Sequence, residues 1–182
     1  MVNDNLKIII VNGRPQCGKT TFEKFCKEKL GFFCEIISTI DIIKTMARVG
    51  GWNGEKTPEA RKLLSDLKDL WTQYNDLSFN TVKNFIQQWE CELEDYHVNS
   101  VPHIVFVDSR EPEEIQKFRE ELGAIAVLVR RPDVEDEESS NHADENVFRC
   151  RYDYELWNTG TLDNLEEIAK NFINLIFDKN VV

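Results

Sequence analysis

The sequence predicts an α/β domain in which helices cover both faces of a doubly wound, mainly parallel five-stranded sheet. Short apolar runs alternate along the chain with longer stretches of helical periodicity, as in repeated strand–helix–strand units. The first run, residues 6–11, is continuous in Ile and Val, as expected for a strand buried on both faces. A Gly-rich turn then leads into the first helix. With 182 residues, the chain is long enough for one such domain with a substantial core.

The positions of the strands and helices follow from these patterns. Gly31 is expected to end the first helix, and Thr57 and Pro58 to begin a later one as its cap and first residue. From there, apolar residues recur at helical spacing with one break, which predicts an antiparallel helix pair between two strands. The expected strands are residues 6–11, 32–37, 104–107, 124–129 and 154–157, and the expected helices are residues 21–30, 40–49, 57–94 (the pair), 112–122 and 165–176.

The turn after the first strand carries the strongest chemical signal. Residues 13–20 match the pattern Gly-x4-Gly-Lys-Ser/Thr, whose glycines let successive backbone N–H groups face phosphate oxygens. The following helix adds the positive end of its dipole. Lys19 would reach the β- and γ-phosphates, and the Thr20 hydroxyl would ligate Mg²⁺. The alternative is a chance match in a strand–turn–helix. The residues expected to hold ATP are Gly13, Arg14, Pro15, Gln16, Cys17, Gly18, Lys19, Thr20 and Thr21.

Two further candidates lie at the end of the third apolar run. They are candidates because ligands of such sheets gather at the carboxyl ends of the strands. Asp108 ends this run, and an acid in that place suits a Walker-B-like carboxylate beside Mg²⁺. Arg110 lies two residues further, and its planar guanidinium suits a phosphate. The alternatives are a helix-capping role for Asp108 and a surface ion pair for Arg110.

Two segments are candidates for substrate binding and closure. Residues 130–151 are polar, acid-rich and too long for an ordinary connection, and two arginines bracket them at each end. A lid of this kind can place an arginine over a transferring phosphoryl group and exclude water, whereas its acids suit a solvated loop. Within it, His142 suits phosphate or lid hydrogen bonding and plain exposure equally well. The helical insertion, residues 57–95, is where a phosphoryl acceptor would bind, with Arg61 on its polar side.

Composition restricts the possible partners. The formal net charge of −11 argues against a nucleic-acid polymer or an anionic membrane, because both need a basic surface. Five cysteines without paired spacing indicate reduced thiols in a cytoplasmic protein. No run approaches 18 apolar residues, and no charged-then-apolar signal begins the chain. The partner expected is a small-molecule phosphoryl acceptor, and the protein is expected to be a monomer or a homodimer.

Several segments, in matching order, resemble the phage-type deoxynucleoside monophosphate kinases, which are P-loop enzymes that move the ATP γ-phosphoryl group onto a deoxynucleoside monophosphate. The loop at 13–21 opens much as theirs does. The resemblance covers residues 6–50 and 104–177 and is thin over 51–100. Thr20 stands where many members carry Asp, and Asp144 replaces the lid Ser. Segments similar to their Asp-x-x-Lys, Asp-Val-Arg-Phe-Pro-Asn-Glu, Arg-Arg-Pro, His-Ala-Ser-Glu and Asn-x-Gly-x-Leu motifs lie at residues 41–44, 108–114, 130–132, 142–145 and 158–162.

This resemblance implies a P-loop kinase fold with an acceptor-binding helical insertion and a lid. By position, it implies that Lys19 and Thr20 hold the triphosphate and Mg²⁺. Asp108 would lie near the metal, and Arg110 on a phosphate. The remaining implied assignments are Asp41 and Lys44 toward the acceptor, and Arg131 and His142 in the closing lid.

The leading hypothesis is ATP-dependent phosphorylation of a (deoxy)nucleoside monophosphate to the diphosphate. Phosphoryl transfer needs positioning and charge neutralisation more than covalent help, which suits a chain without an evident nucleophile-plus-base pair. Two alternatives stay open from the sequence. One is a kinase of another phosphorylated metabolite, of the dephospho-coenzyme A or phosphomevalonate type, and the other is a nucleotide-binding regulatory ATPase.

Overall fold

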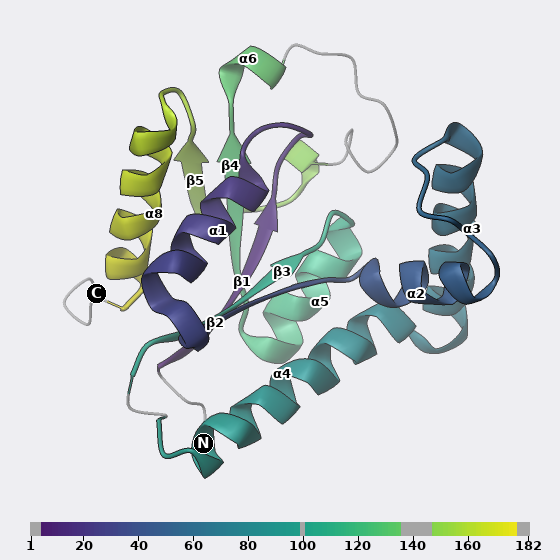
Figure 1. Ribbon diagram of the computed structural model, residues 1–182, viewed down its shortest axis with the longest axis horizontal. Coiled ribbons are helices and arrows are strands. Elements are labelled where there is room, and N and C mark those ends of the chain that lie inside the picture. The colour runs from purple at the N-terminus through teal and green to yellow at the C-terminus, as the bar shows by residue number, and fades with distance from the viewer. Residues whose placement is uncertain (1–4, 99–100, 136–146, 178–182) are drawn as a thin grey trace.

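Five strands form one parallel sheet at the centre of the molecule (Figure 1). The computed structural model describes residues 5–98, 101–135 and 147–177. The strand order is β2-β3-β1-β4-β5, and all four pairings are parallel. The sheet therefore confirms the five strands and the α/β class expected from the sequence. The strands are β1 (Leu6–Asn12), β2 (Cys34–Ser38), β3 (His103–Asp108), β4 (Ile125–Arg130) and β5 (Tyr154–Trp157).

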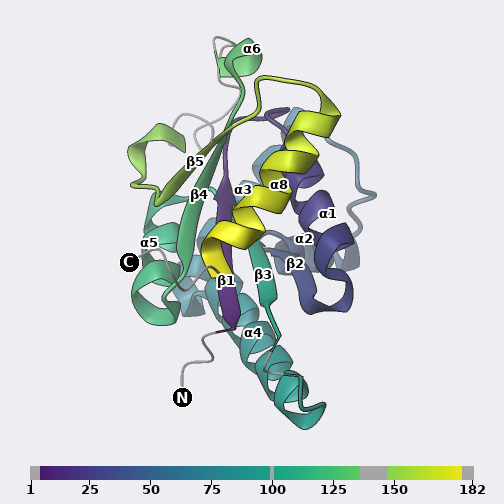
Figure 2. The same cartoon turned by 90° about the vertical axis from the view of Figure 1, so that its left-hand side faces the viewer.

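Helices cover both faces of this sheet (Figure 2). One face packs against α1 (Lys19–Leu30) and α8 (Leu162–Phe177). The other packs against α4 (Leu77–Asp95) and α5 (Pro112–Leu122). Two more helices, α2 (Asp41–Val49) and α3 (Pro58–Asn75), follow β2 and stand beside the sheet.

The core consists of two apolar layers, one on each side of the sheet. Alternate residues of a strand point to opposite faces, so Ile9 and Ile10 of β1 belong to different layers. In the first layer, Phe22 of α1 lies edge-on to Phe106 of β3 and Phe172 of α8, with ring centroids 5.8 and 5.5 Å apart. The carboxyl ends of the five strands lie together at one edge of the sheet, and two of them end on a charged residue, Asp108 of β3 and Arg130 of β4.

Several boundaries differ from the sequence expectation. Gly31–Phe33 form a short 3₁₀ helix, η1, so β2 begins at Cys34 rather than at residue 32. The first helix begins at Lys19 and the last at Leu162, each earlier than its apolar stripe. The expected caps are present: Gly31 has a φ of 63°, and the Thr57 hydroxyl accepts the Ala60 N–H at 3.2 Å.

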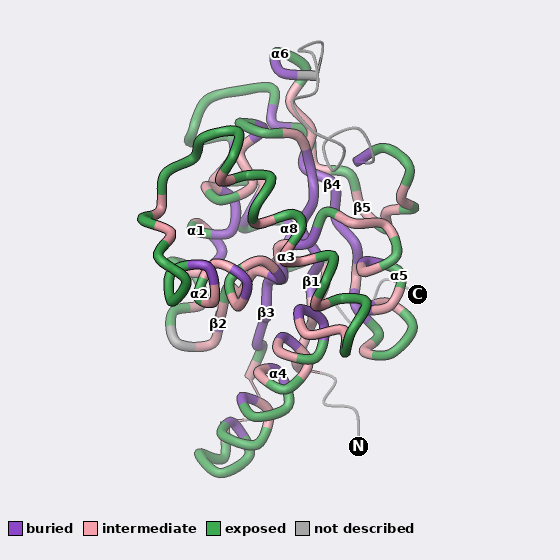
Figure 3. Tube along the Cα trace, turned by 90° about the vertical axis from the view of Figure 1, so that its right-hand side faces the viewer, coloured by how far each residue is buried: buried purple, intermediate pink, exposed green. Residues whose placement is uncertain are grey.

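The helix pair is not antiparallel, which corrects the expectation from its periodicity. Figures 1 and 3 show α4 leading away from the end of α3 rather than back along it. The two helices meet at Asp76, whose backbone is left-handed, with a φ of 55°. Its carboxylate forms an ion pair with Lys117 on α5. α4 has to lie along the sheet because its apolar stripe is buried there, whereas α3 has no fully buried residue and follows a different course.

The segment from 130 to 151 contains two short helices in its described parts, α6 (Pro132–Glu135) and η2 (Val147–Arg149). His142 and the acids around it lie outside the described residues. Among the helices of the described ranges, none has both the length and the apolar character needed to cross a membrane.

Candidate functional site

The loop between β1 and α1 has the backbone of an anion-binding nest. Gly13, Gln16 and Gly18 have φ angles of 146°, 62° and 104°, which turn successive peptide groups inward. Crowding adds to this requirement for glycine. A Cβ on Gly13 would lie 2.4 Å from the Val129 carbonyl oxygen, and one on Gly18 would lie 2.6 Å from Nδ2 of Asn158. The loop then opens into the first turn of α1, whose leading N–H groups lack helical partners.

Lys19 folds back over this loop. Its Nζ donates to the carbonyl oxygens of Gly13 at 2.6 Å and Arg14 at 3.0 Å, and lies 3.8 Å from Sγ of Cys17. Burial lowers the pKa of Lys19, partly offset by the neighbouring Cys17. The ammonium is therefore held inside the loop by neutral acceptors that an anion could replace.

Asp108 lies at the carboxyl end of β3, opposite Val11 of β1. Its carbonyl oxygen accepts the Thr39 N–H at 3.1 Å, which ties it to the end of β2. Burial raises the pKa of Asp108, while the charges of Lys19 and Arg110 lower it. The structure thus brings Lys19 and Asp108 to one edge of the sheet, within electrostatic range of each other and of the exposed Arg110.

Glu23 belongs to the same cluster, although the sequence analysis did not single it out. It lies one turn after Lys19 on α1, is 1% exposed, and its carboxyl group is hydrogen-bonded to that of Asp108. Its Oε1 has no hydrogen-bond partner within the described part of the chain. Burial, and then the negative charge of Asp108, raise the pKa of Glu23 to about 8. The available signal was an acid between Phe22 and Cys26, on the apolar side of the helix.

The other predicted residues are distributed around this centre. Asp41 begins α2, where its carboxylate accepts the Ser38 N–H at 3.1 Å and binds Lys44 Nζ at 3.0 Å. The negative charge of Asp41 acts on Asp108, where it contributes to raising the pKa of that carboxyl group. Thr20 is exposed at the start of α1, and Arg61 is exposed on α3. Arg131 forms an ion pair at 3.5 Å with Asp133, two residues further along the chain.

Beside the loop, an aromatic and arginine stack continues along the carboxyl edge of the sheet. The Arg130 guanidinium lies 4.3 Å from the centroid of Trp157 and 5.2 Å from that of Phe148, and Arg14 lies over Phe148 at 5.6 Å. Both aromatic residues are nearly half exposed. Neither was expected from the sequence to belong to the site. The available signal was, for Trp157, an aromatic residue at the end of an expected strand and, for Phe148, an aromatic residue next to Arg149.

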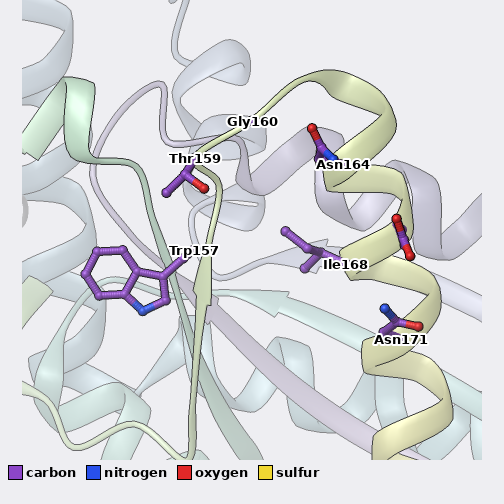
Figure 4. A pocket seen from close by; sticks show the side chains of 7 residues that line it. Trp157, Thr159, Gly160, Asn164, Ile168 and Asn171 are labelled. Carbon is purple, nitrogen blue, oxygen red and sulfur yellow. The ribbon is translucent and has the colours of Figure 1, made fainter.

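A cavity of about 360 Å³ adjoins this stack, between the end of β5 and α8 (Figure 4). It is next to the Gly-rich loop, because the Asn158 amide donates to the Cys17 carbonyl at 2.9 Å. Figure 4 shows Ile168 and Asn171 pointing from α8 toward the strand. The lining is an indole, an aliphatic side chain, amides, a hydroxyl and a carboxylate, from residues Trp157, Thr159, Gly160, Asn164, Glu167, Ile168 and Asn171.

The residues present fit a magnesium ion that is bound together with phosphates. Within residues 5–98, 101–135 and 147–177, no group of three or more His, Cys, Asp or Glu side chains could hold a metal ion alone. Mg²⁺ in phosphate sites needs only one or two carboxylates, because phosphate oxygens and water complete its shell. The exposed Thr20 hydroxyl at the start of α1 and the Asp108 carboxylate at the end of β3 would be the oxygen donors in such a site.

Comparisons with known proteins find similarity only among solved structures. No protein-family model and no curated protein matches the chain. Shikimate kinase from Acinetobacter baumannii aligns over 98% of this chain and 97% of its own, with 13% identity and a TM-score of 0.48. APS kinase from Mycobacterium tuberculosis aligns over 94% of this chain and 97% of its own, with 15% identity and a TM-score of 0.44. Dephospho-CoA kinase from Campylobacter jejuni aligns over 94% of this chain and 97% of its own, with 16% identity and a TM-score of 0.39. At this level of similarity the function has to be argued from the site itself.

Proposed function

We propose that the protein transfers the γ-phosphoryl group of ATP to a small phosphorylated acceptor, a (deoxy)nucleoside monophosphate, and so forms the diphosphate. The observation that supports this most strongly is the convergence of Lys19 and Asp108 on the nest of the Gly-rich loop. Such an arrangement offers backbone N–H groups and one ammonium to a polyphosphate, with a carboxylate at the next strand end.

Each residue has a distinct role in this proposal. Polyphosphate oxygens replace the Gly13 and Arg14 carbonyls as acceptors for Lys19, which then neutralises charge at the β- and γ-phosphates. Thr20 and Asp108 would hold Mg²⁺, which when bound supplies further charge neutralisation between those phosphates. Arg110 contacts a transferring or acceptor phosphate. Catalysis rests on positioning and electrostatics rather than on a covalent intermediate.

The acceptor is proposed to bind on the β2 side of the loop. Asp41 and Lys44 lie there at the start of α2, and Asp41 is within electrostatic range of Asp108. The insertion formed by α3 and α4 borders this side, with Arg61 exposed on α3. Arg131 and His142 are assigned to a lid over the phosphates. The base of ATP is placed on the other side, toward Trp157 and the cavity beside α8.

The test is incubation of the protein with ATP, Mg²⁺ and a panel of nucleoside and deoxynucleoside monophosphates. We expect one or a few acceptors to yield diphosphate, and the same acceptors to raise the melting temperature by mass action. Absence of diphosphate from every acceptor, with folded protein, would refute the proposal. Dephospho-coenzyme A and phosphomevalonate in the same panel test the alternative acceptors.

Lys19→Ala tests the loop assignment in the same assay. Removal of one preorganised charge at a transferring phosphoryl group should lower turnover about 100-fold or more. Lys24→Ala is the matched control, because Lys24 is an exposed lysine of the same helix, 72% accessible. Retained turnover in Lys19→Ala would contradict the role of the loop.

A further inference from the structure

The helix α3 is held to the rest of the protein in an unusual way. None of its 18 residues is fully buried, and its apolar Leu63 and Leu70 are 43% and 60% exposed. Its lysines differ sharply from each other. Lys62 pairs with Asp66 on the helix surface, where the side chains are 75% and 61% exposed. Lys68 instead pairs with Glu114 of α5, and these side chains are only 15% and 9% exposed.

Lys68 is the centre of a polar network at the carboxyl edge of the sheet. Its Nζ donates to Oε2 of Glu114 at 3.0 Å and to the Thr39 hydroxyl at 3.3 Å. The same Glu114 oxygen accepts the Ser109 hydroxyl. The Thr39 hydroxyl and N–H both donate to the Asp108 carbonyl, at 3.4 and 3.1 Å. The Lys68 ammonium therefore connects α3 with the end of β3 by two routes. One runs through Thr39 to Asp108, and the other through Glu114 to Ser109.

We propose that Lys68 is a positioning residue, which fixes α3, and with it the acceptor side of the site, against the Asp108–Ser109 segment. The acceptor part of this proposal rests on the proposed function. The physical reason is that a largely buried ammonium needs its partners, so α3 cannot shift without breaking the two hydrogen bonds of Lys68, to Glu114 and Thr39, at once. Apart from Lys68, α3 is held through partly buried side chains against α2 and α4, without a fully buried apolar residue to fix its position.

Lys68 is expected to affect geometry more than overall stability. The desolvation cost of a buried ion pair offsets most of its electrostatic gain, so its net contribution to folding is small, whereas its directional demands are strict. A helix without buried residues also belongs to the least stable part of a fold and opens locally. Loss of Lys68 should therefore loosen α3 and the main chain at Asp108 and Ser109. The Gly-rich loop, Lys19 and the Asp108 carboxylate, which is hydrogen-bonded to Glu23 on α1, should keep the ATP side in place.

The experiment compares Lys68→Met and Glu114→Gln with the control Lys62→Met, which breaks the exposed pair on the same helix. Amide hydrogen exchange of the nucleotide-free protein is measured for peptides from α3 and from residues 38–42 and 108–111. The Kd for ATP is measured by calorimetry, and the KM for the acceptor in the kinase assay. Glu114→Gln keeps the size of the side chain, so it provides a second variant if Lys68→Met fails to fold.

In Lys68→Met and Glu114→Gln we expect exchange to rise at least about threefold in α3 and in both strand-end peptides. We expect the acceptor KM to rise about tenfold and the Kd for ATP to stay within about twofold. Lys62→Met should behave as wild type. Exchange that matches the control, or a Kd for ATP that rises as much as the acceptor KM, would overturn the proposal. If no acceptor is ever phosphorylated, the proposed function fails, and the exchange data still decide whether Lys68 positions α3.

Discussion

At the scale of single residues, spacing identified the loop and its lysine, whereas burial decided the rest of the cluster. The pattern Gly-x4-Gly-Lys-Thr needs only sequence separation, so Lys19 could be assigned a site from the sequence alone. Glu23 could not, because a charged residue in a helix is usually exposed and only tertiary packing shows that this one is 1% exposed. Its partner, Asp108, was predictable because it ends an apolar run.

The carboxyl pair makes stability depend on pH. Glu23 has a folded-state pKa of about 8 and an ordinary value of 4.5, so the folded state holds a proton that the unfolded state has released. Its contribution is complete below about pH 4.5 and is lost as the pH rises toward 8. We expect Glu23→Gln to remove part of this slope, on the order of 2 kcal/mol between pH 5 and 8.

Urea unfolding of nucleotide-free protein at pH 5 and 8 measures this difference. Glu28→Gln is the control, since Glu28 is an exposed acid of the same helix. Parallel pH profiles for wild type and Glu23→Gln would show that Glu23 ionises normally.

Gly18 and Gly31 both have positive φ angles, but they differ in what surrounds them. A Cβ at Gly18 would lie 2.6 Å from the Asn158 amide, whereas at Gly31 nothing lies within 4 Å. Gly31→Ala should therefore cost about 1 kcal/mol from its backbone alone. Gly18→Ala should cost more and should also weaken ATP binding. Thermal unfolding and ATP titration of the two variants test this; equal losses of stability and unchanged ATP affinity would contradict it.

At the scale of elements, the type of each strand and helix followed from periodicity, and its course through space did not. Parallel strands buried on both faces appear as continuous apolar runs, and all five were expected. The 57–94 pair was given the wrong arrangement, because an apolar stripe does not reveal which surface it covers. Here α4 lies along the sheet, while α3 leaves it at the left-handed Asp76. The start of β2 was missed because the aromatic residues at 32–33 favour a strand although the chain turns there.

The aromatic end of β5 provides a test at the element scale. If the base of ATP lies against Trp157, Trp157→Ala should raise the Kd for ATP about tenfold, as loss of base stacking does elsewhere. Binding of inorganic tripolyphosphate, which has no base, should not change. Tyr96→Ala, at the distant end of α4 and also exposed, is the control. If Trp157→Ala weakened the binding of ATP and of tripolyphosphate equally, Trp157 would act on the phosphate-binding loop rather than on the base.

At the scale of the whole molecule, two cationic side chains gather at one edge of the sheet in an acidic protein. The chain has 33 acidic and 22 basic side chains, yet Lys19 and Arg110 face the same edge as the open end of the nest. The strand order makes this possible, because β1 lies between β3 and β4 and so places the loop beside two strand ends. The sequence predicted the parallel sheet and the strand-end residues. The Lys68 network, which we propose to position α3, could not be predicted in this way, because it joins residues 46 positions apart in sequence and follows no local pattern.

The central claim is that Lys19 and Asp108 act together on one bound polyphosphate. Calorimetric titration of ATP with Mg²⁺ into wild type, Lys19→Ala, Asp108→Asn and the double variant tests it most directly. We expect wild type to bind, Lys19→Ala to lose at least about tenfold in affinity, and the two substitutions to be non-additive by about 1 kcal/mol, as for groups that share a ligand. ATP affinity in Lys19→Ala equal to that of wild type would contradict the claim.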